Sequence, residues 1–177
     1  MEKQQKNILL LSPFFFPEPI STGKFNTDLA IALRDQGHKI IILCFHPFYP
    51  KWEVIKSTEK IVGITIIRGG KNLKYSKKTI LRRMVLEIGY SFFVLRKILK
   101  IQKKIDIIIP VFPPSLAFYL LIPFLNKRIE KVGLVHDLQS VYSSEKTGFV
   151  NCIIRKIIYK VEKKAFQYCD RIVFLSN

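Results

Sequence analysis

Six short apolar segments alternate with segments of helical pattern along this chain. They are rich in isoleucine, leucine and valine, as expected for the strands of a sheet that is covered on both faces. Their ranges are 7–12, 38–45, 63–69, 106–111, 131–137 and 171–177. Strands that alternate with helices predict an α/β fold with a parallel sheet and right-handed crossovers. We therefore expect residues 1–177 to form one Rossmann-like domain, whose ligands bind beyond the carboxyl ends of the strands.

The helical segments are marked by their ends and by their apolar spacing. Residues 27–36 predict a helix that Asn26 or Thr27 caps and that ends at Gln36-Gly37. The other predicted helices span 79–104, the residues after Pro113-Pro114-Ser115, and 152–169.

Two apolar runs need a test against membrane insertion. The N-terminal run is short, contains several prolines and has no A-x-A cleavage site, so we expect the first strand of a cytoplasmic protein. The run from Ile105 to Leu125 has about the length of a bilayer span of ~20 residues. Asp106 and four prolines interrupt it, which favours a strand, a turn and a buried helix.

The chain is strongly basic, with 30 Lys and Arg against 13 Asp and Glu and a formal charge of +17. This balance predicts an anionic partner: nucleic acid, an anionic membrane surface or a phosphorylated substrate. The aromatic residues cluster with prolines in predicted loops, and no zinc knuckle or helix-turn-helix pattern is present, which disfavours nucleic acid. Cys44, Cys152 and Cys169 show no metal-binding spacing, and we expect free thiols and no metal or other cofactor.

The loop after the first strand, "SPFFFPEPISTG", leads into the first helix. It therefore lies on the ligand side of the predicted sheet. Gly23 would let the backbone approach a ligand, and the helix N-terminus would offer free N–H groups. Only one glycine is present, so a GxGxxG dinucleotide site is not indicated. The alternative is a loop that is stiffened by its prolines and packs its own aromatic rings.

Four stretches occur in a suggestive order: "SPFFFPEPISTGKFNTDLAIALRDQGHKI", "CFHPFYPKWEV", "VHDLQS" and "KVEKKAFQYCDRIVFLSN". Together they resemble the N-terminal domain of family 4 glycosyltransferases of GT-B fold, and in particular colanic acid and exopolysaccharide enzymes. The chain departs from that pattern in "PISTGKF", where the family often has two glycines, and in "HDLQS", which lacks a following acidic residue.

The resemblance implies an enzyme of the hexosyltransferase class that moves a sugar from a nucleotide-sugar to a lipid-linked or saccharide acceptor in surface polysaccharide synthesis. Such enzymes have a second, donor-binding domain, which we expect to be absent from residues 1–177 or supplied by a partner subunit. The isolated half is then expected to be inactive. Epimerase chemistry on the same half-fold is a lesser alternative.

The resemblance also implies roles for individual residues. Thr22, Gly23 and Lys24 would meet the donor diphosphate, and Lys24 would add a positive charge unless it is only a surface residue. His136 would approach the donor sugar, and Asp137 would orient it or act as a base. The structural alternative is that Asp137 caps a helix while His136 binds a backbone carbonyl.

His46, Tyr49 and Trp52 follow the second predicted strand and are candidate acceptor contacts. Aromatic faces stack well on sugar rings, but packing within their own loop explains Tyr49 and Trp52 equally well.

The long helix at 79–104 combines apolar and basic residues. Ile80, Met84, Val85, Ile88, Phe92, Leu95, Ile98 and Leu99 recur at steps typical of a helical stripe. Basic residues flank the stripe, and we predict that Arg82, Arg83, Arg96 and Lys97 bind an anionic membrane. The protein would then lie peripherally at the inner face of the cell membrane. A core helix with a solvated basic back is the structural alternative, and a non-catalytic membrane-recruiting subunit of a split glycosyltransferase is the functional one.

Overall fold

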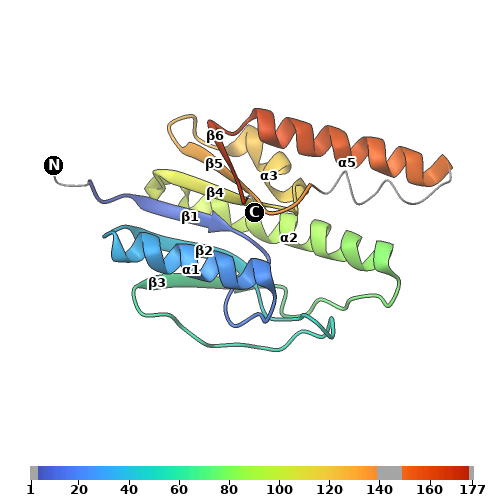
Figure 1. Cartoon of the computed structure of the whole chain (residues 1–177), viewed down its shortest axis with the longest axis horizontal. Coiled ribbons are helices and arrows are strands. Elements are labelled where there is room, and N and C mark those ends of the chain that lie inside the picture. Colours follow the sequence, from blue (N-terminus) through green and yellow to red (C-terminus); the bar gives the residue numbers. More distant parts are fainter. Residues whose placement is uncertain (1–3, 139–148, 176–177) are drawn as a thin grey trace.

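The computed structural model describes residues 4–138 and 149–175, with side chains in the last helix from residue 156 onward. Figure 1 shows the arrangement of the elements. In chain order they are β1 (Asn7–Leu11), α1 (Ser21–Asp35), β2 (Lys39–Phe45), β3 (Ile64–Gly69), α2 (Thr79–Ile101), η1 (Gln102–Lys104), β4 (Ile107–Phe112), α3 (Leu116–Leu121), η2 (Ile122–Phe124), β5 (Glu130–Val135), α5 (Phe149–Gln167) and β6 (Arg171–Phe174).

Within the described residues, the six strands form one parallel sheet in the order β3-β2-β1-β4-β5-β6. Leu9 in β1 pairs with Ile41 on one side and with Ile108 on the other. The chain moves outward in one direction from β1 to β3 and then crosses back to start again at β4. The predicted Rossmann-like α/β fold is therefore confirmed, with its topological switch point between β1 and β4.

Helices cover both faces of the sheet, as the continuous apolar strands require. On one face α1 packs through Ala30 against a core that includes Ile8 and Ile42. On the other face, Val94 of α2, Phe118 of α3 and Ala165 of α5 share a second core with the neighbouring strand residues. Figure 1 shows α1 lying along β2, whereas α2 and α5 lie apart from α1.

Helix α1 begins earlier than predicted. Its first residue is Ser21, and Ile20, in an extended conformation, is the N-cap. The prediction that Asn26 or Thr27 caps the helix is wrong, because both residues lie inside it and their side chains are used elsewhere. The predicted end is confirmed: Gly37 has φ 90°, and the N–H of His38 donates to the carbonyl of Leu33 at 3.2 Å, a Schellman-type end.

The remaining predictions concern the apolar run from Ile105 to Leu125 and the cysteines. The run folds as β4, α3 and η2, as expected. No helix in the described ranges, 4–138 and 149–175, is long and apolar enough to cross a membrane. Cys44 is buried and Cys169 half-buried, and both are free thiols; the side chain of Cys152 lies outside the described residues.

Candidate functional site

The candidate site lies at the carboxyl edge of the sheet, on both sides of the switch point. The β1–α1 loop leaves β1 there, the Pro113-Pro114-Ser115 turn follows β4, and His136 follows β5. In open α/β sheets the crevice at this point is where ligands bind, because the two neighbouring loops diverge.

The N-terminus of α1 is open. Its N-cap, Ile20, makes no side-chain capping bond, and the first turn contains no acidic residue. The N–H of Lys24 donates to the carbonyl of Ile20 at 3.0 Å, so the amides of Ser21, Thr22 and Gly23 precede the first bond of the helix. These amides and the helix dipole favour an anion at this end. Of the three residues predicted to bind phosphate, Lys24 can contribute only its ammonium group.

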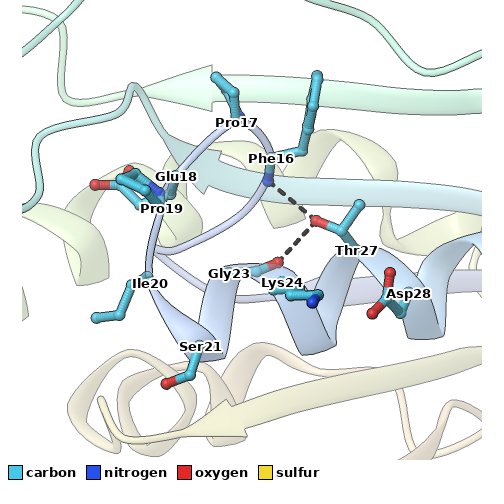
Figure 2. Close-up of a pocket in the computed structure, with 10 residues that line it drawn as sticks. All are labelled: Phe16, Pro17, Glu18, Pro19, Ile20, Ser21, Gly23, Lys24, Thr27 and Asp28. Carbon is cyan, nitrogen blue, oxygen red and sulfur yellow. Dashed lines mark hydrogen bonds between the residues drawn. The ribbon is translucent and has the colours of Figure 1, made fainter.

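A pocket of about 500 Å³ lies beside this turn. Figure 2 shows its walls, which come from the β1–α1 loop and from the first two turns of α1. Thr27 lies between those walls: its Oγ1 accepts the N–H of Phe16 at 3.2 Å and donates to the carbonyl of Gly23 at 2.7 Å. The exposed side chains of Lys24 and Asp28 also line this pocket.

Gly23 is buried, and the missing side chain leaves room for the β1–α1 loop, not for a ligand. A Cβ atom at this position would lie 3.0 Å from the carbonyl oxygen of Glu18 and 3.2 Å from its Cβ. The close approach that a glycine permits is therefore used here to seat the loop on the helix.

Asn26 and Ser12 form a buried polar contact beneath the loop. Asn26 Nδ2 donates to Ser12 Oγ at 2.9 Å and to the carbonyl of Phe14 at 3.2 Å. Asn26 Oδ1 is buried and has no hydrogen-bond partner in the described part of the chain. The pair holds the start of the loop against α1, and the exposed-cap interpretation of Asn26 missed it.

Glu18 joins two loops at this edge and was not singled out from the sequence. Its side chain is 5% exposed, and its carboxylate accepts the N–H groups of Phe48, at 3.0 Å, and of Tyr49. Burial raises the pKa of Glu18, while the two backbone bonds and the charge of Arg68 act in the opposite direction. Arg68 adds a second tie, because its Nη2 donates to the carbonyl of Phe16 at 2.7 Å.

His136 lies on the other side of the switch point. Its backbone N–H donates to the carbonyl of Phe112 at 3.0 Å, and its ring centroid lies 6.1 Å from that of Phe25 in α1. Its Nε2 is buried and has no hydrogen-bond partner among the residues that the structure describes. Burial lowers the pKa of His136, and the nearby charge of Asp137 partly offsets the effect. Burial therefore favours the neutral form of the imidazole.

The predicted phosphate and catalytic residues lie on different sides of α1. Lys24 and Thr27 line the pocket, whereas Phe25 contacts His136. Asp137 is exposed beside His136, and the following residues of "HDLQS", from Gln139 on, lie outside the described residues.

The predicted acceptor residues belong to the loop after β2. His46 Nδ1 accepts the N–H of Ser57 at 3.2 Å, and its pKa is lowered by burial first and then by the neighbouring cations of Arg68, Lys71 and Lys56. Tyr49 and Trp52 pack together, with ring centroids 6.2 Å apart and an interplanar angle of 78°. Packing of the loop on itself, which the sequence left as an alternative, accounts for both aromatic rings.

The four basic residues predicted to bind a membrane are not equivalent. Arg83 and Lys97 fall in line with Leu86 and Tyr90, which are buried, but Arg83 itself is exposed and Lys97 is half-buried. Arg82 lies over the ring of Trp52. Arg96 is exposed and is the member of the four that borders the outer side of the helix.

Among the residues that the structure describes, no group of three or more His, Cys, Asp or Glu side chains could hold a metal ion. No protein-family model matches the chain, and no curated protein matches its sequence. The case for a function therefore rests on the fold and on the chemistry of the residues at the carboxyl edge.

Proposed function

We propose that this chain is the N-terminal, acceptor-side domain of a GT-B glycosyltransferase of family 4. The reaction would transfer a hexose from a nucleotide-sugar to a lipid-linked acceptor in surface polysaccharide synthesis. The donor-binding domain would be supplied outside residues 1–177. The ordered motifs of the sequence and the Rossmann-like sheet support this proposal.

One observation carries the proposal: an open helix N-terminus and an imidazole nitrogen that has no partner among the described residues lie on the two sides of one switch point, where Phe25 of α1 meets His136. The amides of Thr22 and Gly23 suit the diphosphate, which gains negative charge as it leaves. His136 Nε2 suits a sugar hydroxyl, because a buried polar atom without a partner gains most from a new hydrogen bond.

In the proposed reaction, an acceptor hydroxyl oxygen forms a bond to the anomeric carbon of the donor sugar. The bond from that carbon to the phosphate oxygen breaks, and the nucleoside diphosphate leaves with the electron pair. The hydroxyl proton goes to a base, for which Asp137 is the candidate on this chain. The protein contributes mostly by positioning and by offsetting charge.

The test is NMR titration of the full chain with UDP-glucose, GDP-mannose and dTDP-glucose. We expect weak binding that shifts the amide signals of Thr22 and Gly23 and the ring signals of His136. His136→Ala should remove the response, and His38→Ala, at the far edge of the sheet, should leave it intact. Signals that stay unchanged with every donor, or a response that survives in His136→Ala, would contradict the proposed site.

A transfer assay tests the half-enzyme part separately. The chain alone should transfer no sugar from these donors to a polyprenyl-diphosphate-linked hexose. Robust transfer by residues 1–177 would show that the chain needs no second domain.

The second candidate is a non-catalytic subunit that recruits a catalytic partner to the membrane. It is favoured by the outer face of α2, which is apolar and exposed. The two candidates differ at His136: ligand-dependent shifts of its ring support the first and have no place in the second.

A further inference from the structure

Helix α2 has two apolar faces, and only one of them is used by the core. The inner face contributes Leu86, Tyr90, Val94 and Ile98, which are at most 8% exposed. The outer face carries a second row at helical steps of three and four residues. This α2 outer row consists of Leu81, Met84, Ile88, Phe92, Leu95 and Leu99.

The α2 outer row is exposed along its length. Phe92 is 71% exposed, Leu99 56% and Met84 49%, and Leu95 is half-buried. From Leu81 to Leu99 the row extends for about 27 Å at ~1.5 Å per residue. A contiguous apolar strip of this size on a basic protein marks an interaction surface.

Positive charge borders the row on one side. Lys78, Arg96, Lys100 and Lys103 are exposed and recur along that side of α2 and η1. The sole acidic residue of α2 is Glu87, which is half-buried. Exposed apolar side chains beside a line of cations match the interface of an anionic bilayer. There the apolar side chains enter the acyl boundary and the cations meet the anionic headgroups.

Other occupants fit these residues less well. A second copy of the chain would bring together two surfaces that each carry part of a formal charge of +17, and like charges repel. A nucleic acid binds mainly through phosphate contacts and leaves a row of leucine, methionine and phenylalanine without a partner. Helix α2 is also too polar to cross a membrane, which leaves a position parallel to its surface.

We propose that the α2 outer row and its basic border dock this domain flat on an anionic lipid bilayer. This inference stands on α2 alone and does not require the proposed transfer reaction. It has one consequence for that reaction. In a parallel sheet, α2 runs opposite to the strands, so its N-terminal end lies at the carboxyl edge. With α2 in the membrane plane, the switch-point crevice opens along the bilayer surface, where a lipid-linked acceptor would lie.

Vesicle flotation tests the docking. The full chain is mixed with vesicles of phosphatidylglycerol and phosphatidylcholine, or of phosphatidylcholine alone. We expect flotation with the anionic vesicles and its loss at high salt, which screens headgroup contacts. Phe92→Glu should lower the partition coefficient at least about tenfold, because it removes a large apolar side chain that would be buried in the bilayer interface.

Matched controls separate this surface from general charge effects. Val62 is 89% exposed and lies beside α1, where its carbonyl accepts a bond from Arg34. Val62→Glu makes the same charge change as Phe92→Glu and should float like the wild type. Arg96→Glu with Lys100→Glu should also lose flotation, while Lys39→Glu with Lys60→Glu should retain it. The comparison of these two double variants keeps the test valid if Phe92→Glu fails to fold.

Three results would overturn the proposal. The wild type could fail to float with anionic vesicles, or the α2 variants could float as well as their matched controls. The wild type could also be a dimer without lipid, by light scattering, that Phe92→Glu converts to a monomer; the row would then be an interface between copies of the chain.

Discussion

The guanidinium carbon of Arg82 lies 4.1 Å from the centroid of the Trp52 ring. This contact joins the first turns of α2 to the loop that follows β2. Trp52 also has a positive φ of 59°, which is rare for a bulky residue, so packing must hold the loop in this conformation. Phe48 and Tyr75 complete that packing, with ring centroids 5.4 Å from the Trp52 ring in both cases.

The first prediction concerns this contact. Trp52 is the single tryptophan of the chain, so intrinsic fluorescence reports on it alone. Arg82→Ala should shift its emission to longer wavelength, raise quenching by acrylamide, and cost about 0.5–2 kcal/mol of unfolding free energy. Arg83→Ala removes a neighbouring cation from the same helix and should leave the emission unchanged. Equal spectra for both variants would contradict a specific Arg82–Trp52 contact.

The second prediction concerns Glu18, which holds the amides of Phe48 and Tyr49. Glu18→Ala leaves two buried N–H groups without an acceptor and should cost about 1–3 kcal/mol per group at most. Glu18→Gln keeps an acceptor oxygen and should retain most of the stability. Urea unfolding of both variants measures the difference. Similar losses for Ala and Gln would mean that the hydrogen bonds are not what matters.

The same residue gives a pH dependence. Burial raises the folded-state pKa of Glu18 above its unfolded value. The contribution of its protonated form is therefore fully present below the unfolded pKa and is lost as the pH rises through the folded pKa. Relative to Glu18→Gln, the wild type should lose stability on going from pH 4 to pH 7. A stability difference that is constant over that range would contradict the raised pKa.

Much of the fold could be predicted because its signals are local. The continuous apolar strands, the Gly37 helix end and the length of α2 are each written in a short window of sequence. The start of α1 could not be predicted in this way. Asn26 has the side chain of a good N-cap, but its tertiary bonds to Ser12 and Phe14 place it inside the helix. Tertiary contacts overrode the local capping preference.

The candidate site was predicted in part. The position of His136 after β5 followed from the strand pattern, whereas its unpartnered Nε2 depends on side chains far away in the sequence. Glu18 was missed because a glutamate between two prolines gives no sign of burial. The α2 stripe was found as a pattern, but periodicity could not tell which apolar row faces the sheet. That distinction places Arg83 and Lys97 in line with the inner row, although Arg83 is exposed and Lys97 half-buried.

The third prediction concerns the titration of His136. Its pKa lies below the ordinary value because of burial, and Asp137 acts in the opposite direction. Asp137→Asn should therefore lower the His136 pKa further, as measured from the ring proton shifts by NMR. A depressed histidine pKa gives stability that is present above the unfolded value and lost as the pH falls through the folded one. A rise of the His136 pKa in Asp137→Asn would contradict this electrostatic arrangement.

The fourth prediction concerns Gly69, the last residue of β3. A Cβ atom there would lie 2.4 Å from Cδ2 of Phe93, and the Phe93 ring packs against the rings of Phe45 and Tyr90. Gly69→Ala should therefore cost about 1–3 kcal/mol of unfolding free energy, since the partly buried ring is packed against its neighbours and has little room to move.

Gly89 in α2 is the matched control for Gly69. A Cβ atom there would lie 3.2 Å from two methyl groups of Leu73, a flexible side chain, and alanine favours a helix interior over glycine by about 0.5–1 kcal/mol. Gly89→Ala should thus be neutral or stabilising. Gly69→Ala should also perturb the His46 ring signals, because the N–H of His46 donates to the carbonyl of Gly69 at 3.0 Å. If both glycine variants unfold at the same denaturant concentration, the prediction is contradicted. Steric crowding at Gly69 would then not stabilise the end of β3 or the candidate acceptor loop beside it.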